Sequence, residues 1–410
     1  MSAALAIPPF GVVAAALRKT TERLAAEVVQ SSASPPEWSE LEWAIARSVA
    51  AMQGISALLA NNLTWSGPPA WVAFLAEQRE QGLKRHARIG ALLERIDAAA
   101  RARGIECVAL KGAALRGLDL YRPGERPMGD VDLLVASRDM QAIAAAMVEI
   151  DYVEAFEMQR HRVFEPRSKM PAQGYGEHVD NPLKIEIHAI VAEPLPVRKV
   201  DITAHLWSGR MRLGLNNYPD LVSLLLHLLL HAAGNIRAHA LRQIQLHDIA
   251  LVGSLLYERD WGLLLEARHE DEASWWLYPP LALTARYYPN HIPSEALRAA
   301  RRACPRILRV AAARQSLTDV SWSNLRIHAF PGIAWSRTPL EALRFVRCRM
   351  LPSRTALAEI DMARQAQPQL DAVPWYRVPH GSRILRWLVS RPPRVQTMVS
   401  VIAALRDARS

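Results

Sequence analysis

One short segment constrains the fold of this chain more than any other part of its sequence. Residues 130–136 read Asp-Val-Asp-Leu-Leu-Val-Ala, and their apolar run is too short for a helix and rich in strand formers. Successive side chains point to opposite faces of a strand, so Asp130 and Asp132 share one face, roughly 6 to 7 Å apart. The segment therefore predicts a buried strand that presents two carboxylates.

A third acid lies in the alternating segment Leu-Lys-Ile-Glu-Ile-His at residues 183–188. The alternation puts Lys184, Glu186 and His188 on one face of a predicted strand and the two isoleucines on the other face. If this strand lies beside the first strand, Glu186 converges with the two aspartates.

Three converging carboxylates favour a site for a hard divalent cation. Mg²⁺ is held by one or two carboxylates together with substrate phosphates, and a pair of ions clamps both ends of an in-line phosphoryl displacement. We therefore expect Mg²⁺ or Mn²⁺ to bind to Asp130, Asp132 and Glu186. Each acidic motif taken alone also fits a solvated surface strand, so the prediction depends on a phosphate site nearby.

Such a site is indicated by Lys111 and Gly112. Residues 105–110 (IECVAL) form another short apolar run that ends at this pair, and residues 112–120 then have a helical pattern. A strand, a glycine and the N-terminus of a helix place free N–H groups and the helix dipole toward an anion. We expect Lys111 and Gly112 to contact phosphate.

These motifs, taken in chain order, resemble the uncharacterised nucleotidyltransferase family within the DNA polymerase β-like superfamily. The resemblance covers roughly residues 40–300 and rests on Leu110-Lys111-Gly112, Tyr121, Arg126, the Asp130–Val135 run and Glu186-Ile187-His188. It implies an α+β fold, in which a small mixed sheet is flanked by helices, with two acids on one strand and the third on the next. It also implies Mg²⁺ and the transfer of a nucleoside monophosphate from a nucleoside triphosphate. In one departure, Lys111-Gly112 replaces the usual Gly-Ser phosphate loop of the superfamily.

The first hypothesis is a Mg²⁺-dependent nucleotidyltransferase. The acids Asp130 and Asp132 would bridge two ions, and Glu186 would complete one ion's shell and help deprotonate an acceptor hydroxyl. The triphosphate charge would be neutralised by basic residues, and the expected nucleotide contacts are Lys111, Gly112, Arg126, Lys184 and His188. The nucleotide is expected to be ATP. A protein side chain, tRNA, a small antibiotic and a modified peptide all stay open as the acceptor.

Two alternatives come from other classes of protein. The fold can bind nucleotide without turnover, or the chain can be a helical protein whose basic tail contacts nucleic acid or membrane. Residues 295–410 contain 20 Arg, no Lys and 7 acids, a charge of +13, so the whole chain at +10 leaves −3 for the first 294 residues. Residues 381–391 interleave arginines with apolar residues, a pattern of surface-binding or packed helices.

Helical spacing dominates outside the acidic strands. Helices are expected over residues 11–30, 36–61, 69–103, 137–150, 219–233, 237–259 and 271–288, with Gly104 and Ser137 as end signals. A weak strand is expected over 160–164, and the loop at 166–176 is expected beside the active site. The predicted divisions are 1–68 (N-terminal helices, packed over the catalytic core), 69–196 (nucleotidyltransferase core), 197–312 (helical domain) and 313–410 (basic helical region).

Four polar residues in the predicted helical domain are secondary candidates. His227 and His231 are four residues apart without a third ligand, which favours semi-buried polar contacts or a position lining the substrate cleft. Arg242 and Asp248 are expected to line a pocket or to pair structurally, since a buried acid needs a partner.

The three cysteines and the apolar segments bear on location. Three widely spaced cysteines match neither a disulfide framework nor a zinc site, so a reducing cytoplasm is expected. The most apolar internal run, 221–233, is too short to cross a bilayer, and no transmembrane segment is expected.

Overall fold

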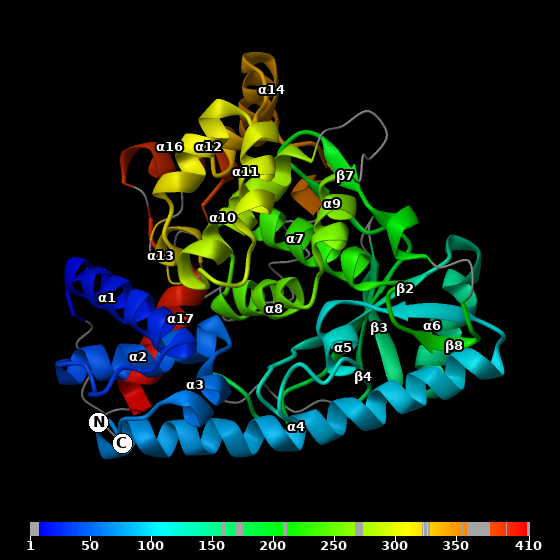
Figure 1. Ribbon diagram of the computed structural model, residues 1–410, viewed down its shortest axis with the longest axis horizontal. Helices are drawn as coiled ribbons and strands as arrows, with labels where there is room; N and C mark the ends of the chain where they lie inside the picture. The colour runs from blue at the N-terminus through cyan, green and yellow to red at the C-terminus, as the bar shows by residue number, and fades with distance from the viewer. Residues whose placement is uncertain are drawn as a thin grey trace.

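The computed structural model describes residues 8–157, 161–168, 175–207, 211–266, 274–321, 323, 326, 329–354, 356–358, 378–390 and 392–407. Helices surround a mixed sheet, which confirms the predicted α+β class. The long helix α4 (Pro69–Ala102) runs along one edge of the molecule beside the sheet, and the helices from α7 to α14 lie on the opposite side (Figure 1). The catalytic candidates lie between these layers.

The sheet brings the acidic strands together as expected. Its six strands have the order β3-β4-β5-β2-β1-β8, in which β2 and β5 run parallel and β1 runs antiparallel to β2. The β2–β5 register places Asp132 opposite Glu186. The strands of the sheet are β1 (Glu106–Ala109), β2 (Asp130–Val135), β3 (Tyr152–Glu157), β4 (His161–Pro166), β5 (Lys184–His188) and β8 (Gly214–Asn216), and a separate pair is β6 (Ala192–Pro194) and β7 (Lys199–Asp201).

The helices have the following bounds. Before and within the sheet they are α1 (Phe10–Val29), α2 (Glu40–Gln53), α3 (Ser56–Asn62), α5 (Lys111–Arg116) and α6 (Met140–Glu149). The later helices are α7 (Leu221–Ala238), α8 (Gln243–Ser254), α9 (Glu258–Glu266), α10 (Tyr278–Tyr287), α11 (Ser294–Ala303), α12 (Arg306–Arg314), α13 (Leu317–Val320), α14 (Pro339–Met350), α16 (His380–Val389) and α17 (Val395–Asp407). Short 3₁₀ turns are η1 (Ser137–Asp139), η2 (Thr203–Leu206), η3 (Trp275–Leu277) and η4 (Ile333–Trp335).

The observed helix ends agree with some of the end signals in the sequence and differ from others. Gly104 follows α4 with φ +66°, a left-handed conformation that glycine adopts without a Cβ clash, so this end is confirmed. The expected Ser137 cap is wrong, because the chain first makes the turn η1 and the Ser137 side chain makes no cap hydrogen bond. Pro219 does not open α7 either, since the Asp220 side chain accepts from the Ser223 N–H at 2.7 Å.

The helix predicted at 237–259 is present, but its bounds are wrong. The helix α7 continues to Ala238, His239 takes a left-handed conformation (φ +56°), and α8 starts at Gln243. The ring Nδ1 of His239 lies 2.6 Å from the Asp319 carbonyl, so a tertiary contact supports the break without glycine or proline. Part of the helix expected over 271–288 lies outside the described residues, and its described portion starts at Tyr278.

The N-terminal helices form a hydrophobic core of their own instead of covering the catalytic core directly. Their buried side chains cluster with the first turns of α4 and with Val401 of α17, whereas the sheet shares its core with α4, α7 and α10. The Arg47 guanidinium donates to the Ala404 carbonyl at 3.3 Å, which joins α2 to α17. The two ends of the chain therefore lie side by side (Figure 1).

Helix α7 is longer than the apolar run suggests. It has 18 residues with mean hydropathy 1.4, which is long and apolar enough to cross a bilayer, and 61% of it is buried inside the protein. The pair α2 and α3, bent by 111°, passes the same test if counted as one span. Among the described helices, α7 is also a central core element, since it contributes Leu225 and Leu229 to the main hydrophobic cluster.

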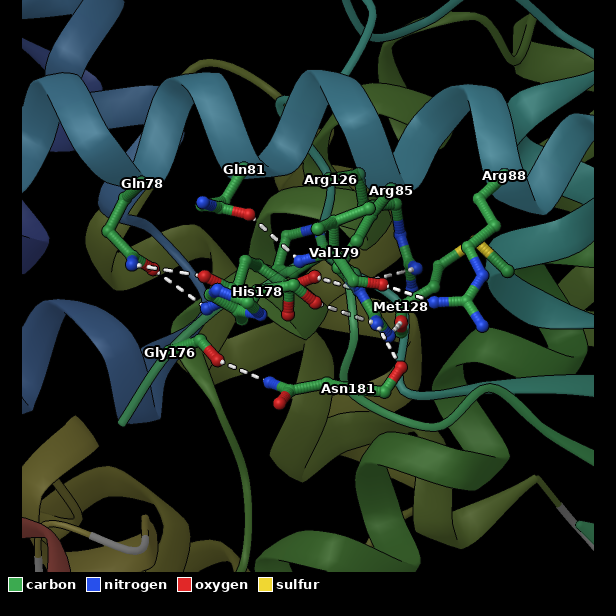
Figure 2. Close-up of polar contacts among 12 residues, drawn as sticks. Gln78, Gln81, Arg85, Arg88, Arg126, Met128, Gly176, His178, Val179 and Asn181 are labelled. Carbon is green, nitrogen blue, oxygen red and sulfur yellow. Dashed lines mark hydrogen bonds and ion pairs between the residues drawn. The ribbon is translucent and has the colours of Figure 1, made fainter. Parts of the chain in front are cut away.

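One face of α4 holds the segment that leads into β5 (Figure 2). Gln78, Gln81, Arg85 and Arg88 recur at helical spacing and bind the backbone of residues 176–181. Gln78 both donates to the Glu177 carbonyl at 3.2 Å and accepts from the Glu177 N–H at 2.8 Å. This segment therefore has a fixed path over α4, although it has no regular secondary structure.

Arg85 connects this segment to the loop before β2. Its side chain is 3% exposed and forms an ion pair with Glu177 at 2.6 Å. The same guanidinium donates to the carbonyls of His178 (3.2 Å), Asn181 (2.7 Å) and Met128 (2.7 Å). Since Met128 precedes Asp130 by two residues and Asn181 precedes Lys184 by three, Arg85 aligns the starts of β2 and β5.

We predict that Arg85→Met lowers the free energy of unfolding by about 3 kcal/mol, because the partly buried Glu177 carboxylate and three backbone carbonyls lose their partner. Urea denaturation measures the change. The matched control is Arg88→Met, which removes one hydrogen bond to Val179 from an exposed position and should cost about 1 kcal/mol. Equal losses in both variants would contradict the aligning role.

Candidate active site

The paired strands β2 and β5 place four polar side chains in one place. Asp132, Glu186 and His188 each offer a ligand atom within 4.8 Å of the others, a geometry that could hold a metal ion. Asp130 lies two residues before Asp132 on the same strand. It lines a cavity together with Asp132 but does not belong to the group of three ligands. The structure thus brings two of the three predicted acids into contact range and adds His188, which the sequence had placed with the nucleotide.

Asp132 already has two partners. Its Oδ1 accepts from the Lys111 ammonium and lies against the Nε2 of His188, both at 3.0 Å, and the residue is 5% exposed. Burial alone opposes ionisation of this carboxyl, but the Lys111 charge and the contact with His188 outweigh it and hold its pKa well below the usual range. Asp132 is therefore a carboxylate at neutral pH.

The other two acids have raised pKa values. Burial, followed by repulsion from Asp132 and Asp130, raises the pKa of Glu186 to about 7. Desolvation by the surrounding protein, followed by the Asp132 charge, also raises the pKa of Asp130, although this residue is exposed at the start of β2. The Nε2 atoms of His161 and His188 lie 3.7 and 3.8 Å from Glu186. The site has a surplus of negative charge that a cation would relieve.

Lys111 stands where β1 gives way to α5. Its φ is +47°, an uncommon conformation for a residue with a side chain, and its N–H donates to the Tyr218 hydroxyl at 3.1 Å. The nearby acids outweigh burial and raise the pKa of its ammonium. Helix α5 has six residues, fewer than the expected 112–120, so the ammonium is the main positive charge here, with little help from a helix dipole.

Arg126 is committed to a structural pair. Its Nε and Nη2 donate to the two oxygens of Asp248 at 2.8 and 2.7 Å, and the Tyr121 hydroxyl donates to the same carboxylate at 2.6 Å. Asp248 is 1% exposed, so this bidentate pair neutralises a buried charge. A side chain at Gly112 would collide with the Arg126 guanidinium, which explains the glycine.

Lys184 forms its ion pair with an acid outside the proposed metal group. Its ammonium pairs with Glu165 of β4 at 2.9 Å, and its side chain is 38% exposed. Lys184 shares the strand face of Glu186, as predicted. Its positive charge acts on Glu186 and lowers the pKa of that carboxyl.

Arg242, at the N-terminal end of α8, is the basic residue that sequence reasoning underrated. It lines the cavity that contains Asp130, and within the described part of the chain its guanidinium has neither an ion pair nor a hydrogen bond. Burial lowers its pKa, while the charge of Asp130 acts in the opposite direction. A guanidinium that lines a cavity and forms no direct ion pair among the described residues is a binding group for an anion.

Two cavities meet at Lys111. The larger one, about 360 Å³, lies between the sheet and the helices α7 and α8, and its lining includes Lys111, Gly112, Asp130, Asp132, Asn235, Arg242 and Gln245. The smaller one, about 190 Å³, lies on the β5 side, and its lining includes Lys111, His161, Glu186, His188, Glu193, His227 and His231. The acids therefore separate two spaces, as a group-transfer site requires.

Both histidines of α7 combine the two roles considered for them. Burial lowers the pKa of His227 to about 3 and that of His231 well below its usual value, so both rings are neutral. The His227 Nδ1 is hydrogen-bonded to the Tyr218 hydroxyl at 2.6 Å, and the His231 Nε2 is hydrogen-bonded to Asn235 at 3.1 Å. They are satisfied polar groups that line the smaller cavity.

Acids on adjacent strands of a small mixed sheet, a cation at the preceding strand–helix junction and two adjoining cavities define a group-transfer enzyme of the nucleotidyltransferase class. A family model described as "Uncharacterised nucleotidyltransferase" matches residues 39–289, more than half of the chain, and the chain belongs to this family. Comparisons with curated proteins and with solved structures found no match.

We predict a pH dependence of stability that originates at Glu186. Its native pKa of about 7 exceeds the ordinary value of 4.5, so its contribution is fully present below pH 4.5 and is lost as pH rises through 7. Between pH 5 and 8, the free energy of unfolding in EDTA should fall by up to about 3 kcal/mol more in the native protein than in Glu186→Gln. Parallel profiles from urea denaturation would show that Glu186 titrates normally.

Proposed function

We propose that this nucleotidyltransferase moves a nucleoside monophosphate from ATP to an acceptor hydroxyl, with Mg²⁺ or Mn²⁺ bound at Asp132, Glu186 and Asp130. The observation that carries the proposal is the group of acids between two cavities, the larger of which is also lined by Arg242. ATP is proposed because it is the most abundant nucleoside triphosphate in cells.

The donor set supports an oxygen-preferring ion. Two carboxylates and one imidazole lie within 4.8 Å, and the raised pKa values of Asp130 and Glu186 reflect unbalanced negative charge. Carboxylates and phosphates suit Mg²⁺, while the imidazole of His188 is also acceptable to Mn²⁺. When bound, such an ion supplies stabilisation of the charge that develops on the transferred phosphoryl group.

The larger cavity is the proposed nucleotide site. Lys111 and Arg242 line it from opposite elements and supply positive charge to the triphosphate. Arg126 keeps its pair with Asp248 and shapes the Gly112 wall, so it supports the site without leaving its partner. Positioning and electrostatics are the main contributions of a protein to phosphoryl transfer.

The smaller cavity is the proposed acceptor site. A hydroxyl beside Glu186 would give its proton to that carboxylate while the hydroxyl oxygen forms a bond to the α-phosphorus. The bond from that phosphorus to the bridging oxygen of the β-phosphate breaks, and pyrophosphate leaves. His161 and His188 flank Glu186 and orient its carboxylate. The cavity suits one sugar ring or one amino acid side chain, which keeps protein, RNA, peptide and antibiotic acceptors open.

We predict that Arg242→Ala and Lys111→Ala each weaken ATP binding in the presence of Mg²⁺ by about 1 to 3 kcal/mol, the range for a lost hydrogen bond to a charged group. Isothermal titration calorimetry measures the affinities. The control is Arg301→Ala, which removes an exposed guanidinium on α11 and should leave the affinity unchanged. If the protein binds ATP no better than adenosine, phosphate is not recognised in this cavity.

A separate proposal concerns the basic last third of the chain. On α16, Leu385, Leu388 and Val389 are 63%, 57% and 79% exposed, next to the exposed Arg386. We propose weak binding to RNA or to anionic vesicles, with affinity that falls steeply between low and physiological salt. Arg391 lies outside the described residues. Salt-independent binding, or none at low salt, would assign these arginines to packing and solubility.

A further inference from the structure

The ion pair between Lys111 and Asp132 occupies the centre of the proposed metal site. The Lys111 Nζ lies 3.0 Å from Asp132 Oδ1, and His188 lies at 3.0 Å from the same oxygen. An ammonium that close to a carboxylate provides the charge compensation that a metal ion would otherwise provide. The residue assigned to phosphate and the residue assigned to metal are therefore bound to each other in this structure.

Lys111 is placed to reach both cavities. It lines the larger and the smaller cavity, and its side chain is 19% exposed. Its ion pair is with Asp132, while Asp130 acts on it only over a longer distance. A triphosphate that enters the larger cavity, which Asp132 also lines, would therefore meet the same ammonium.

The choice of lysine fits a movable charge. Of the 50 basic residues in the chain, 44 are arginine, yet position 111 is lysine. The backbone there is held by Tyr218, so the movement is left to the four-carbon side chain, which carries a compact ammonium. The planar fork of an arginine would bind Asp132 through two hydrogen bonds and release it less readily.

We propose that Lys111 is a transferable counterion: it neutralises Asp132 in the empty site and moves to the triphosphate when nucleotide binds, which frees Asp132 for the metal. This inference rests on the proposed function and adds that nucleotide binding releases Asp132 for the metal. Nucleotide and metal then promote each other's binding, because one ammonium competes with the metal for Asp132 and is removed by the nucleotide.

The competing possibility is a static pair, in which Lys111 stays on Asp132 and Arg242 alone holds the phosphates. The two possibilities differ in the metal-free protein. If Lys111 must leave Asp132 to contact ATP, removal of the Asp132 charge should raise the affinity for ATP. This increase in affinity should require Lys111. A static pair gives no such dependence.

The first experiment measures ATP binding to the full chain in EDTA as a double-mutant cycle. Asp132→Asn should tighten ATP binding about tenfold, and the same substitution in a Lys111→Met background should change it less than about twofold. The matched control is Asp130→Asn, which removes one charge from the same cavity without breaking an ion pair and should have less than about a third of that effect. Circular dichroism verifies that each variant is folded.

Equal effects of the two asparagine variants, or an Asp132→Asn effect that survives in Lys111→Met, would overturn the transfer. Failure of the proposed function looks different, since wild-type protein would then bind no ATP even with Mg²⁺ or Mn²⁺. If the protein binds metal and ATP together but the effects of the two substitutions are additive, the transfer of Lys111 is rejected and the proposed function stands.

The second experiment measures Mn²⁺ binding without nucleotide by electron paramagnetic resonance. Lys111→Met should bind Mn²⁺ about tenfold more tightly than the wild type, whereas Lys111→Arg should bind it no more tightly. Lys184→Met is the charge-matched control, because its ammonium pairs with Glu165 outside the cluster, and it should change the affinity by less than about threefold. Equal gains from Lys111→Met and Lys184→Met would overturn the proposal.

Discussion

A single buried guanidinium determines how the two acidic strands face each other. Arg85 of α4 binds the backbone on both sides of the sheet entry, at Met128 before β2 and at Asn181 before β5. Strand pairing sets the spacing of Asp132 and Glu186 along the sheet, but the loops that lead into the strands have no regular secondary structure of their own. Helix α4 thus fixes the relative positions of two loops that are far apart in sequence.

The electrostatics of the site follow from crowding acids into a buried space. Asp132 keeps its charge because Lys111 and His188 compensate it, and this charge in turn raises the pKa of its neighbours Glu186 and Asp130. The same rule applies to the two arginines near Asp248, because Arg126 forms the ion pair with this acid, and Arg242 forms no direct ion pair among the described residues. A basic side chain that already forms an ion pair with an acid of the protein is less available to bind a substrate.

Sequence alone predicted what depends on local periodicity. Alternation placed Asp130 with Asp132 and Glu186 with His188 on common faces, and the two strands paired as expected. Sequence could not decide which of two arginines meets Asp248, because that choice depends on a contact between residues 122 positions apart. The break at His239 and the weight of Arg242 were missed for the same reason, and the loop expected beside the site lies partly outside the described residues.

The packing of α17 on α2 has a consequence for biosynthesis. The hydrogen bond from Arg47 to Ala404 spans 357 residues, and Val401 completes the core made by the first helices. Contacts of such sequence separation form late, since the intervening loop must close first. As the chain leaves the ribosome, the first helices keep an exposed apolar face until residues 395–407 have been synthesised, and such a face is prone to aggregation.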